Sequence, residues 1–295
     1  MAVAILRFMI ASSDGGCPGP RFRRPGLAFI ALLVPLIIGC SAPPAPARAA
    51  SVAAVAAIAD PRLAPALEAL GRATPSLGPA VAASIRGHIE ADPKGFLPLL
   101  DSVLAERGAD PWRFARADKV APPLPSGFEP PDLVALDGKK VAIAKDGLKL
   151  RREVLAALAA MTAAARTEGL KLVVGSTYRS WAYQKAVFAR EVAAYGEAQA
   201  RRESAEAGRS QHQLGTVVDF SPIDEAFASR PEFAWLSARA AGFGFSRSYP
   251  EGMEAVTGYR SETWHWRWIG TAATKLQKDY FGDVQQYLLL FLSYR

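Results

Sequence analysis

Cysteine and histidine are scarce in this chain. Its 295 residues include two cysteines, Cys17 and Cys40, and both lie within the first 40 residues. The rest of the chain therefore has no pair of thiols for a disulfide and no thiolate that could act as a nucleophile or a metal ligand. Three histidines are present, His88, His212 and His265, so a site built on imidazole must draw on these positions.

The sequence also lacks a concentrated positive charge. The formal net charge is +7, and residues 1–39 contribute four arginines against one aspartate, so a chain without them would carry +4. No stripe of lysine and arginine alternates with aromatic residues, which argues against a nucleic-acid-binding protein. A mild positive charge is compatible with an anionic polymer such as a cell wall.

An apolar run over residues 26–38 follows three arginines and is interrupted by Pro35. It is too short for a comfortable transmembrane helix, and residues 1–39 are typical of an export signal. The run ends in Gly39-Cys40, and a small residue before a cysteine at this place resembles the bacterial lipoprotein signal, in which Cys40 would carry the lipid. Conventional cleavage after Ala49 and a retained membrane anchor are the alternatives.

Composition divides the rest of the chain into three parts. Residues 40–50 are rich in proline and alanine and are expected to form a flexible tether. In residues 51–115, apolar side chains recur at helical spacing and frequent prolines limit the helices to short pieces, which predicts a helical N-terminal region. Residues 116–295 are expected to form the main domain.

Within the main domain, patterns of period 2 and period 3.6 alternate irregularly, which favours an α+β fold over a regular βαβ series. The predicted helices cover residues 151–168, 180–203 and 231–241, and the predicted strands cover residues 170–174, 215–220 and 264–268. The apolar segment 287–292 is too short to span a membrane and is expected to dock as a terminal element.

Two short polar patches hold the residues that suit metal-assisted hydrolysis. The first is Ser210-Gln-His212-Gln-Leu-Gly-Thr-Val-Val-Asp219, and Glu262-Thr-Trp-His265 follows 43 residues later. A hydrolytic zinc site needs three protein ligands, an open position for water and a carboxylate that takes the proton of that water. His212, Asp219 and His265 can supply the ligands if His265 comes from a strand beside Asp219, and Glu262 is the candidate base.

These patches resemble the D-alanyl-D-alanine carboxypeptidase family of zinc peptidases related to VanY. The family carries a Ser-x-His-x-x-Gly-x-x-x-Asp patch and a Glu-x-Trp-His patch, and both occur here in the same order. A Tyr-Arg-Ser block, Tyr178-Arg179-Ser180, and the following Gln184 are a third shared feature. The resemblance covers residues 118–270. Thr177 and Thr216 depart from the usual residues, which puts at most the substrate preference in doubt.

The resemblance implies a small antiparallel sheet flanked by helices that carries the zinc site. It implies that the zinc ligands are His212, Asp219 and His265 and that Glu262 is the catalytic base. Arg179 would polarise the scissile carbonyl and stabilise the oxyanion, although an arginine after a strand can also simply pair with a carboxylate. Ser210 and Gln184 would contact substrate or orient the ligands. The remaining histidine, His88, is expected to be an unrelated surface residue.

The implied activity is removal of the terminal D-alanine from peptidoglycan stem peptides by a zinc enzyme. An L,D-carboxypeptidase, a D,D-dipeptidase, an endopeptidase of the same fold and a non-catalytic zinc-containing wall-binding module are the alternatives. We expect a monomer in the cell envelope that is held at the membrane by a lipid anchor and meets peptidoglycan there, with no nucleic-acid partner.

We expect Cys40→Ser to release the protein into the soluble envelope fraction, or to leave the precursor uncut, because the residue that would receive the lipid is lost. Cell fractionation and the mass of the mature N-terminal peptide check this expectation. A mature chain that begins at Ala50 and carries no lipid would contradict the lipoprotein interpretation and favour conventional secretion.

Overall fold

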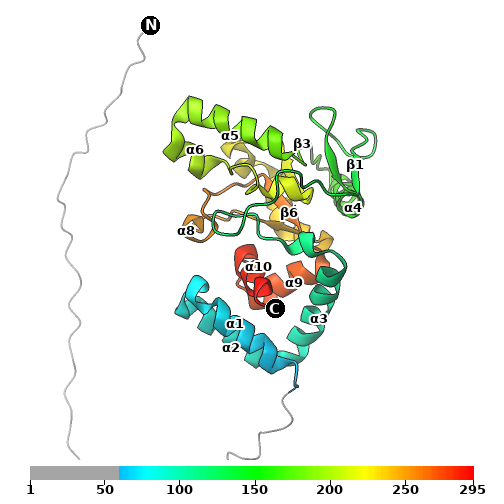
Figure 1. The fold of residues 1–295 in the computed structure, drawn as a ribbon. Helices are drawn as coiled ribbons and strands as arrows, with labels where there is room; N and C mark the ends of the chain where they lie inside the picture. The colour runs from blue at the N-terminus through cyan, green and yellow to red at the C-terminus, as the bar shows by residue number, and fades with distance from the viewer. Residues whose placement is uncertain (1–59) are drawn as a thin grey trace, which may run out of the picture. The chain divides into compact units, whose positions relative to one another are not determined.

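The computed structural model describes residues 60–295, and Figure 1 shows their fold. The export signal, Cys40 and the tether lie outside the described residues, so their interpretation stays a prediction. Among the described helices, none combines the length and apolar character needed to cross a bilayer. The described chain is α+β, with a small antiparallel sheet and a helical N-terminal region, as predicted from the sequence.

Prolines and a glycine set the length of the N-terminal helices. These are α1 (Leu63–Leu77), α2 (Pro79–Ala91), α3 (Pro93–Ala109) and the 3-10 turn η2 (Pro111–Phe114). A proline opens α2, α3 and η2, where its missing N–H would have no helical partner. Gly78 separates α1 from α2 at a φ of 85°, and Asp92 caps α3 by accepting a hydrogen bond from the amide of Gly95.

The main sheet has four antiparallel strands in the order β3-β4-β6-β5. The strands are β3 (Val174–Ser176), β4 (Val217–Phe220), β5 (Phe245–Arg247) and β6 (His265–Trp268), and a separate hairpin pairs β1 (Leu133–Ala135) with β2 (Lys149–Arg151). In the central pair, Asp219 of β4 lies opposite His265 of β6. This register brings together residues that are 46 positions apart in the sequence.

Helices and turns surround this sheet. They are α4 (Arg152–Thr167), α5 (Trp181–Tyr195), α6 (Glu197–Glu203), η3 (Gln211–Leu214), η4 (Glu225–Ser229), α7 (Pro231–Arg239), η5 (Ala240–Phe243), α8 (Glu254–Thr257), α9 (Thr271–Tyr280) and α10 (Gln285–Ser293). The helix predicted at 151–168 is confirmed as α4, and the one predicted at 231–241 is α7 continued by η5.

Two predicted elements differ from the structure. The helix expected over 180–203 is broken at Gly196, whose φ of 80° ends α5 before α6 begins. Helical spacing in this segment also predicts an apolar stripe of Trp181, Phe188, Val192 and Tyr195. This prediction is wrong, because Tyr195 is 67% exposed and the buried residue of α5 is Gln184. The strand expected at 170–174 begins only at Val174, where pairing with β4 starts.

The apolar side chains form two main clusters. One lies between α4, the four-stranded sheet and α7, and it includes Trp264, Trp266 and Trp268, which therefore belong to the core. The other joins α1, α2 and α3 to α9 and α10, and it buries residues 288–292 of the C-terminal segment and part of Tyr287. The N-terminal helical region thus shares its core with the last two helices of the chain, which lie beside it in Figure 1.

We expect Phe291→Ala on α10 to lower the free energy of unfolding by about 3–5 kcal/mol, since a buried aromatic is replaced by a cavity. Phe291 is fully buried and packs against Phe96 of α3 and Phe281, with ring centroids 6.4 and 5.1 Å away. Guanidinium denaturation measures the change. Tyr195→Ala, at an exposed position of α5, is the control and should stay within about 0.5 kcal/mol of the parent. An equal loss in both variants would contradict the shared core.

Candidate metal centre

Three elements bring the two histidines and the aspartate together. Asp219 and His265 face each other across β4 and β6. His212 lies in η3, which ends at Gly215 with a φ of 68° and leads directly into β4. A Cβ at position 215 would come within 3.0 Å of side-chain atoms of Leu133 and Arg151, so the tight turn also requires glycine for space.

His212 stands just before the predicted strand 215–220, a position that predicts a flexible loop, but the structure shows a buried turn instead. The backbone amide of His212 donates to the hydroxyl of Ser210, 3.3 Å away, and this side chain caps η3. All four residues of η3 are buried. The imidazole is therefore held in place by the fold before any ligand arrives.

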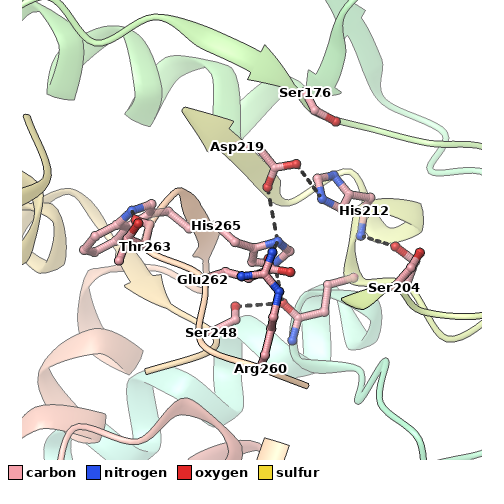
Figure 2. Close-up of polar contacts among 12 residues, drawn as sticks. Ser176, Ser204, His212, Asp219, Ser248, Arg260, Glu262, Thr263 and His265 are labelled. Atoms are coloured by element: carbon pink, nitrogen blue, oxygen red, sulfur yellow. Dashed lines mark hydrogen bonds and ion pairs between the residues drawn. The ribbon is translucent and has the colours of Figure 1, made fainter. Parts of the chain in front are cut away.

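The three side chains form one compact donor group. One nitrogen from each histidine and one carboxylate oxygen lie within 4.8 Å of one another, and all three residues are buried. Nε2 of His212 lies 3.1 Å from Oδ2 of Asp219, and Nδ1 of His265 lies 3.2 Å from Oδ1. Figure 2 shows the carboxylate of Asp219 with a contact to each imidazole.

A hydrogen bond at the far nitrogen of each ring sets the nitrogen that faces Asp219. Nδ1 of His212 lies 2.6 Å from the carbonyl oxygen of Thr177, and since a carbonyl only accepts, Nδ1 carries the proton. Nε2 of His265 lies 3.1 Å from Oε1 of Gln211 and donates to it. The lone pairs of Nε2 in His212 and Nδ1 in His265 are thereby left for a ligand.

This arrangement fits a metal cation. Burial, followed by the charge of Arg179, lowers the pKa of His212 to about 4, so its ring is neutral at pH 7. A lone pair on its Nε2 then faces a carboxylate oxygen at 3.1 Å, and two acceptors at that distance repel each other. Oδ1 of Asp219 is also buried without a hydrogen-bond partner among the described residues. A cation between the donors would satisfy all of these atoms.

Glu262 lies beside this group rather than inside it. Its Oε2 is 3.4 Å from Nδ1 of His265, and Figure 2 shows the side chain next to that ring. Burial, reinforced by the negative charge of Asp219, raises the pKa of Glu262 to about 8. A dication bound nearby would lower this pKa again. The carboxyl is thus placed to exchange a proton near neutral pH, as a general base must.

Arg179 is paired with the aspartate of the donor group. Its Nη2 donates to Oδ2 of Asp219 at 2.9 Å, and Nη2 and Nε both donate to the hydroxyl of Ser176 at 2.8 and 3.1 Å. Nη1 has a long contact of 3.5 Å with Oε1 of Gln184. The guanidinium therefore pairs with a carboxylate, which was the structural alternative for Arg179. It also lines a cavity above the donor group.

A cavity of about 370 Å³ opens over the donor group and is lined mainly by polar residues. Ser210 and Gln184 both line it, but each also has a structural contact. Ser210 caps η3. The amide nitrogen of Gln184 donates to the carbonyl of Ala205 at 2.7 Å, so this side chain fastens α5 to the segment after α6.

The sequence indicated no role in the site for several residues that surround it. Gln211 stands between Ser210 and His212 in the first patch, but its contact with His265 depends on the tertiary fold. The ring of Tyr249 packs on His265 with centroids 4.7 Å apart. Arg260 lies over the ring of Trp264 and forms ion pairs with Glu203 and Glu225 at the edge of the cavity. Apart from the contact of Arg260 with Trp264, these contacts join segments that are distant in the sequence, so no sequence spacing reveals them.

Comparison with protein families finds a match over the part of the chain that contains the candidate metal ligands and Glu262. The family model VanY, described as D-alanyl-D-alanine carboxypeptidase, matches residues 147–271. The Bacillus subtilis protein YodJ is 36% identical over 171 residues, which is 56% of this chain and 63% of that protein. A D-alanyl-D-alanine carboxypeptidase of Enterococcus faecalis is 36% identical over 123 residues, or 38% of this chain and 46% of the relative. The chain thus spans less than two thirds of the length of either curated relative.

Two solved structures are similar in fold and sequence. The LdcB LD-carboxypeptidase has a TM-score of 0.50 and 35% identity, and the match covers 55% of this chain and 82% of that one. A variant of the vancomycin resistance D,D-pentapeptidase VanY, solved in complex with Zn(II), has a TM-score of 0.50 and 27% identity. That match covers 60% of this chain and 99% of the other.

We expect His212→Ala and His265→Ala to lose bound metal, because each removes one of three protein ligands. Glu262→Gln should keep the metal, since this carboxylate lies outside the donor group. The purified variants are incubated with zinc, freed of excess and measured by elemental analysis. Loss of metal from Glu262→Gln would instead make Glu262 a ligand, and full metal content in His212→Ala would remove His212 from the site.

Proposed function

Because this chain belongs to the VanY-related family of D-alanyl-D-alanine carboxypeptidases, we propose that it is a zinc-dependent peptidase that removes the terminal D-alanine from peptidoglycan stem peptides. One observation carries the proposal. Three buried ligands converge at the floor of a polar cavity, and a fourth carboxylate, that of Glu262, lies beside them. A site that needed zinc only for structure would have no use for that carboxylate.

The chain would hold zinc through Nε2 of His212, a carboxylate oxygen of Asp219 and Nδ1 of His265. When bound, zinc supplies Lewis-acid chemistry, which polarises a carbonyl and makes water acidic near neutral pH. The carbonyl of Thr177 keeps the ring of His212 oriented for this task.

Glu262 would transfer a proton from the attacking water to the leaving group. One of its carboxylate oxygens takes a proton from the attacking water, and the same oxygen later gives it to the nitrogen of the leaving D-alanine. The side chain is almost buried, so bulk water competes little for this proton. Arg179 would donate to the carbonyl oxygen as negative charge develops there, and Ser210 and Gln184 would orient the substrate or the groups that bind it.

Of the two solved structures described above, the one with the greater identity to this chain favours a second candidate function. LdcB is an LD-carboxypeptidase, and its structure matches this chain at 35% identity. The same site could therefore cleave the bond that follows an L-centre in a tetrapeptide stem. The difference between the two activities depends on how the cavity holds the residue before the scissile bond, not on the metal ligands.

Product masses decide between these activities. The full mature protein is loaded with zinc and incubated with muropeptides that carry pentapeptide or tetrapeptide stems, with Glu262→Gln as the control. Loss of one alanine from the pentapeptide supports the proposal, and loss from the tetrapeptide alone selects the L,D-carboxypeptidase. Release of a dipeptide or cleavage of cross-linked stems selects a D,D-dipeptidase or an endopeptidase. No product from zinc-loaded protein favours a wall-binding module.

We propose further that the protein works in the cell envelope as a lipoprotein attached through Cys40. The apolar run before Gly39-Cys40 and the Pro/Ala-rich stretch after it support this proposal. A tether of ten residues reaches at most about 35 Å when it is extended, which would allow the domain to meet the wall above the membrane.

We expect Arg179→Lys to reduce kcat/KM at least tenfold, which corresponds to about 1.4 kcal/mol of transition-state stabilisation. A lysine keeps the charge, but its three N–H groups diverge from one nitrogen. They cannot reproduce the planar set by which Nε and Nη2 bond Ser176 and Asp219 while Nη1 is left for a substrate carbonyl. Steady-state kinetics on the preferred muropeptide measures the loss, and metal content shows whether the ligands are intact. Normal kinetics would leave Arg179 with a purely structural role.

A further inference from the structure

Gln211 joins a ligand histidine to a second layer of buried side chains. Its Oε1 lies 3.1 Å from Nε2 of His265 and 2.7 Å from the hydroxyl of Ser248. Figure 2 shows Ser248 on the side of His265 that is away from Asp219. Gln211, Ser248 and His265 are all buried, so no bulk water can replace these contacts.

The chain of contacts continues into the C-terminal helix. The hydroxyl of Ser248 lies 3.2 Å from the amide of Gln285, and the side chain of Gln286 donates to the backbone carbonyl of Ser248 at 2.6 Å. A hydroxyl has one proton to donate, and Gln211 receives it over the shorter distance. An amide of Gln285 turned by 180° would then donate to Ser248 and satisfy Nε2, which otherwise has no partner among the described residues.

The two ligand histidines are therefore oriented in different ways. The partner of His212 is a backbone carbonyl, that of Thr177, which no substitution of a side chain removes. The partner of His265 is the side chain of Gln211, which is itself held by Ser248. Helix α10 belongs to the core that includes the N-terminal helices. The orientation of His265 thus depends on a part of the chain that lies outside the VanY match at residues 147–271.

We propose that Gln211 is a positioning residue that holds His265 with Nδ1 toward the metal, and that Ser248 and α10 hold Gln211 for this task. The inference rests on the zinc site of the proposed function. Partners of this kind fix the tautomer and the ring of a ligand histidine, and their loss lowers metal affinity by about 10- to 100-fold. The N-terminal and C-terminal helices then contribute to the metal site although none of their side chains binds the metal.

The zinc affinities of the parent protein and of two variants at Gln211 test whether Gln211 holds His265. Gln211→Met keeps the length of the side chain but removes the acceptor, so we expect zinc to bind at least about tenfold more weakly. Gln211→Glu keeps an acceptor for Nε2 of His265 and for Ser248, and we expect wild-type affinity or tighter. Competition with a chromophoric chelator gives the dissociation constants, and thermal unfolding of the metal-free proteins reports stability separately.

Two buried serines, Ser248 and its control Ser246, test whether Ser248 and α10 hold Gln211 in place. Ser246 and Ser248 stand two residues apart and are both buried, and each bonds a glutamine of a C-terminal helix. Ser246 bonds Gln277 of α9 at 2.8 Å, and this contact does not reach a ligand. We expect Ser248→Ala to weaken zinc binding by about 3- to 10-fold. Ser246→Ala should leave zinc binding unchanged while it lowers stability to a similar degree.

The outcomes separate this inference from the proposed function, because zinc binding is measured without any substrate. Equal zinc affinity in Gln211→Met and the parent overturns the role of Gln211, even if the protein is a peptidase. Weak binding in both Gln211→Met and Gln211→Glu overturns an acceptor role, and equal effects of Ser246→Ala and Ser248→Ala overturn the link to α10. Rescue by glutamate supports the inference even if no muropeptide is cleaved. A parent protein that binds no zinc overturns both.

Discussion

The burial of one carboxylate governs the chemistry of this molecule. Asp219 is 1% exposed, and a charge in such a place is costly unless other groups compensate it. Arg179 provides one donor, to Oδ2, but both imidazoles turn lone pairs toward the carboxylate. The protein thus assembles three acceptors at close range and leaves their repulsion to be relieved by a cation. Metal binding and the stability of this part of the fold are expected to be coupled for that reason.

The surrounding elements maintain this arrangement. Antiparallel pairing of β4 with β6 sets Asp219 against His265, and a shift by one residue would turn one of them to the opposite face of the sheet. The tight turn at Gly215 folds η3 back on β4, so that His212 lies next to Asp219. The helical region takes part as well, because its core includes α10, and α10 bonds Ser248 behind the site.

The sequence predicts the parts of this structure that depend on local pattern. The strand at His265 and the helix over 152–167 follow from period 2 and period 3.6, and both are present. The apolar stripe assigned to α5 failed, because the buried position of that helix is taken by Gln184, whose partners come from another segment. Periodicity reports which face is apolar, but it cannot report a polar side chain that is buried because it is bonded.

The polar residues of the candidate site were also only partly predictable from the sequence. Residue types and order indicated His212, Asp219, His265 and Glu262, since a hydrolytic metal site needs those groups and few were available. Gln211 could not be recognised in the same way, because a glutamine beside a histidine has no special meaning until the fold places its amide next to His265. Contacts between segments distant in sequence are a product of the fold, and a single sequence contains no direct signal for them.

The geometry of Arg179 is compatible with both roles that the sequence offered for it, pairing with a carboxylate and stabilisation of an oxyanion. A guanidinium has five N–H donors in a rigid plane, so it can pair with a carboxylate and still bind another group. Here Nε and Nη2 are engaged by Ser176 and Asp219, while Nη1 is limited to one long contact with Gln184. The pairing fixes the plane of the side chain before a substrate arrives, so a donor directed at a carbonyl would need no reorganisation. Structural pairing is thus the condition for a catalytic role of Arg179 and not an argument against it.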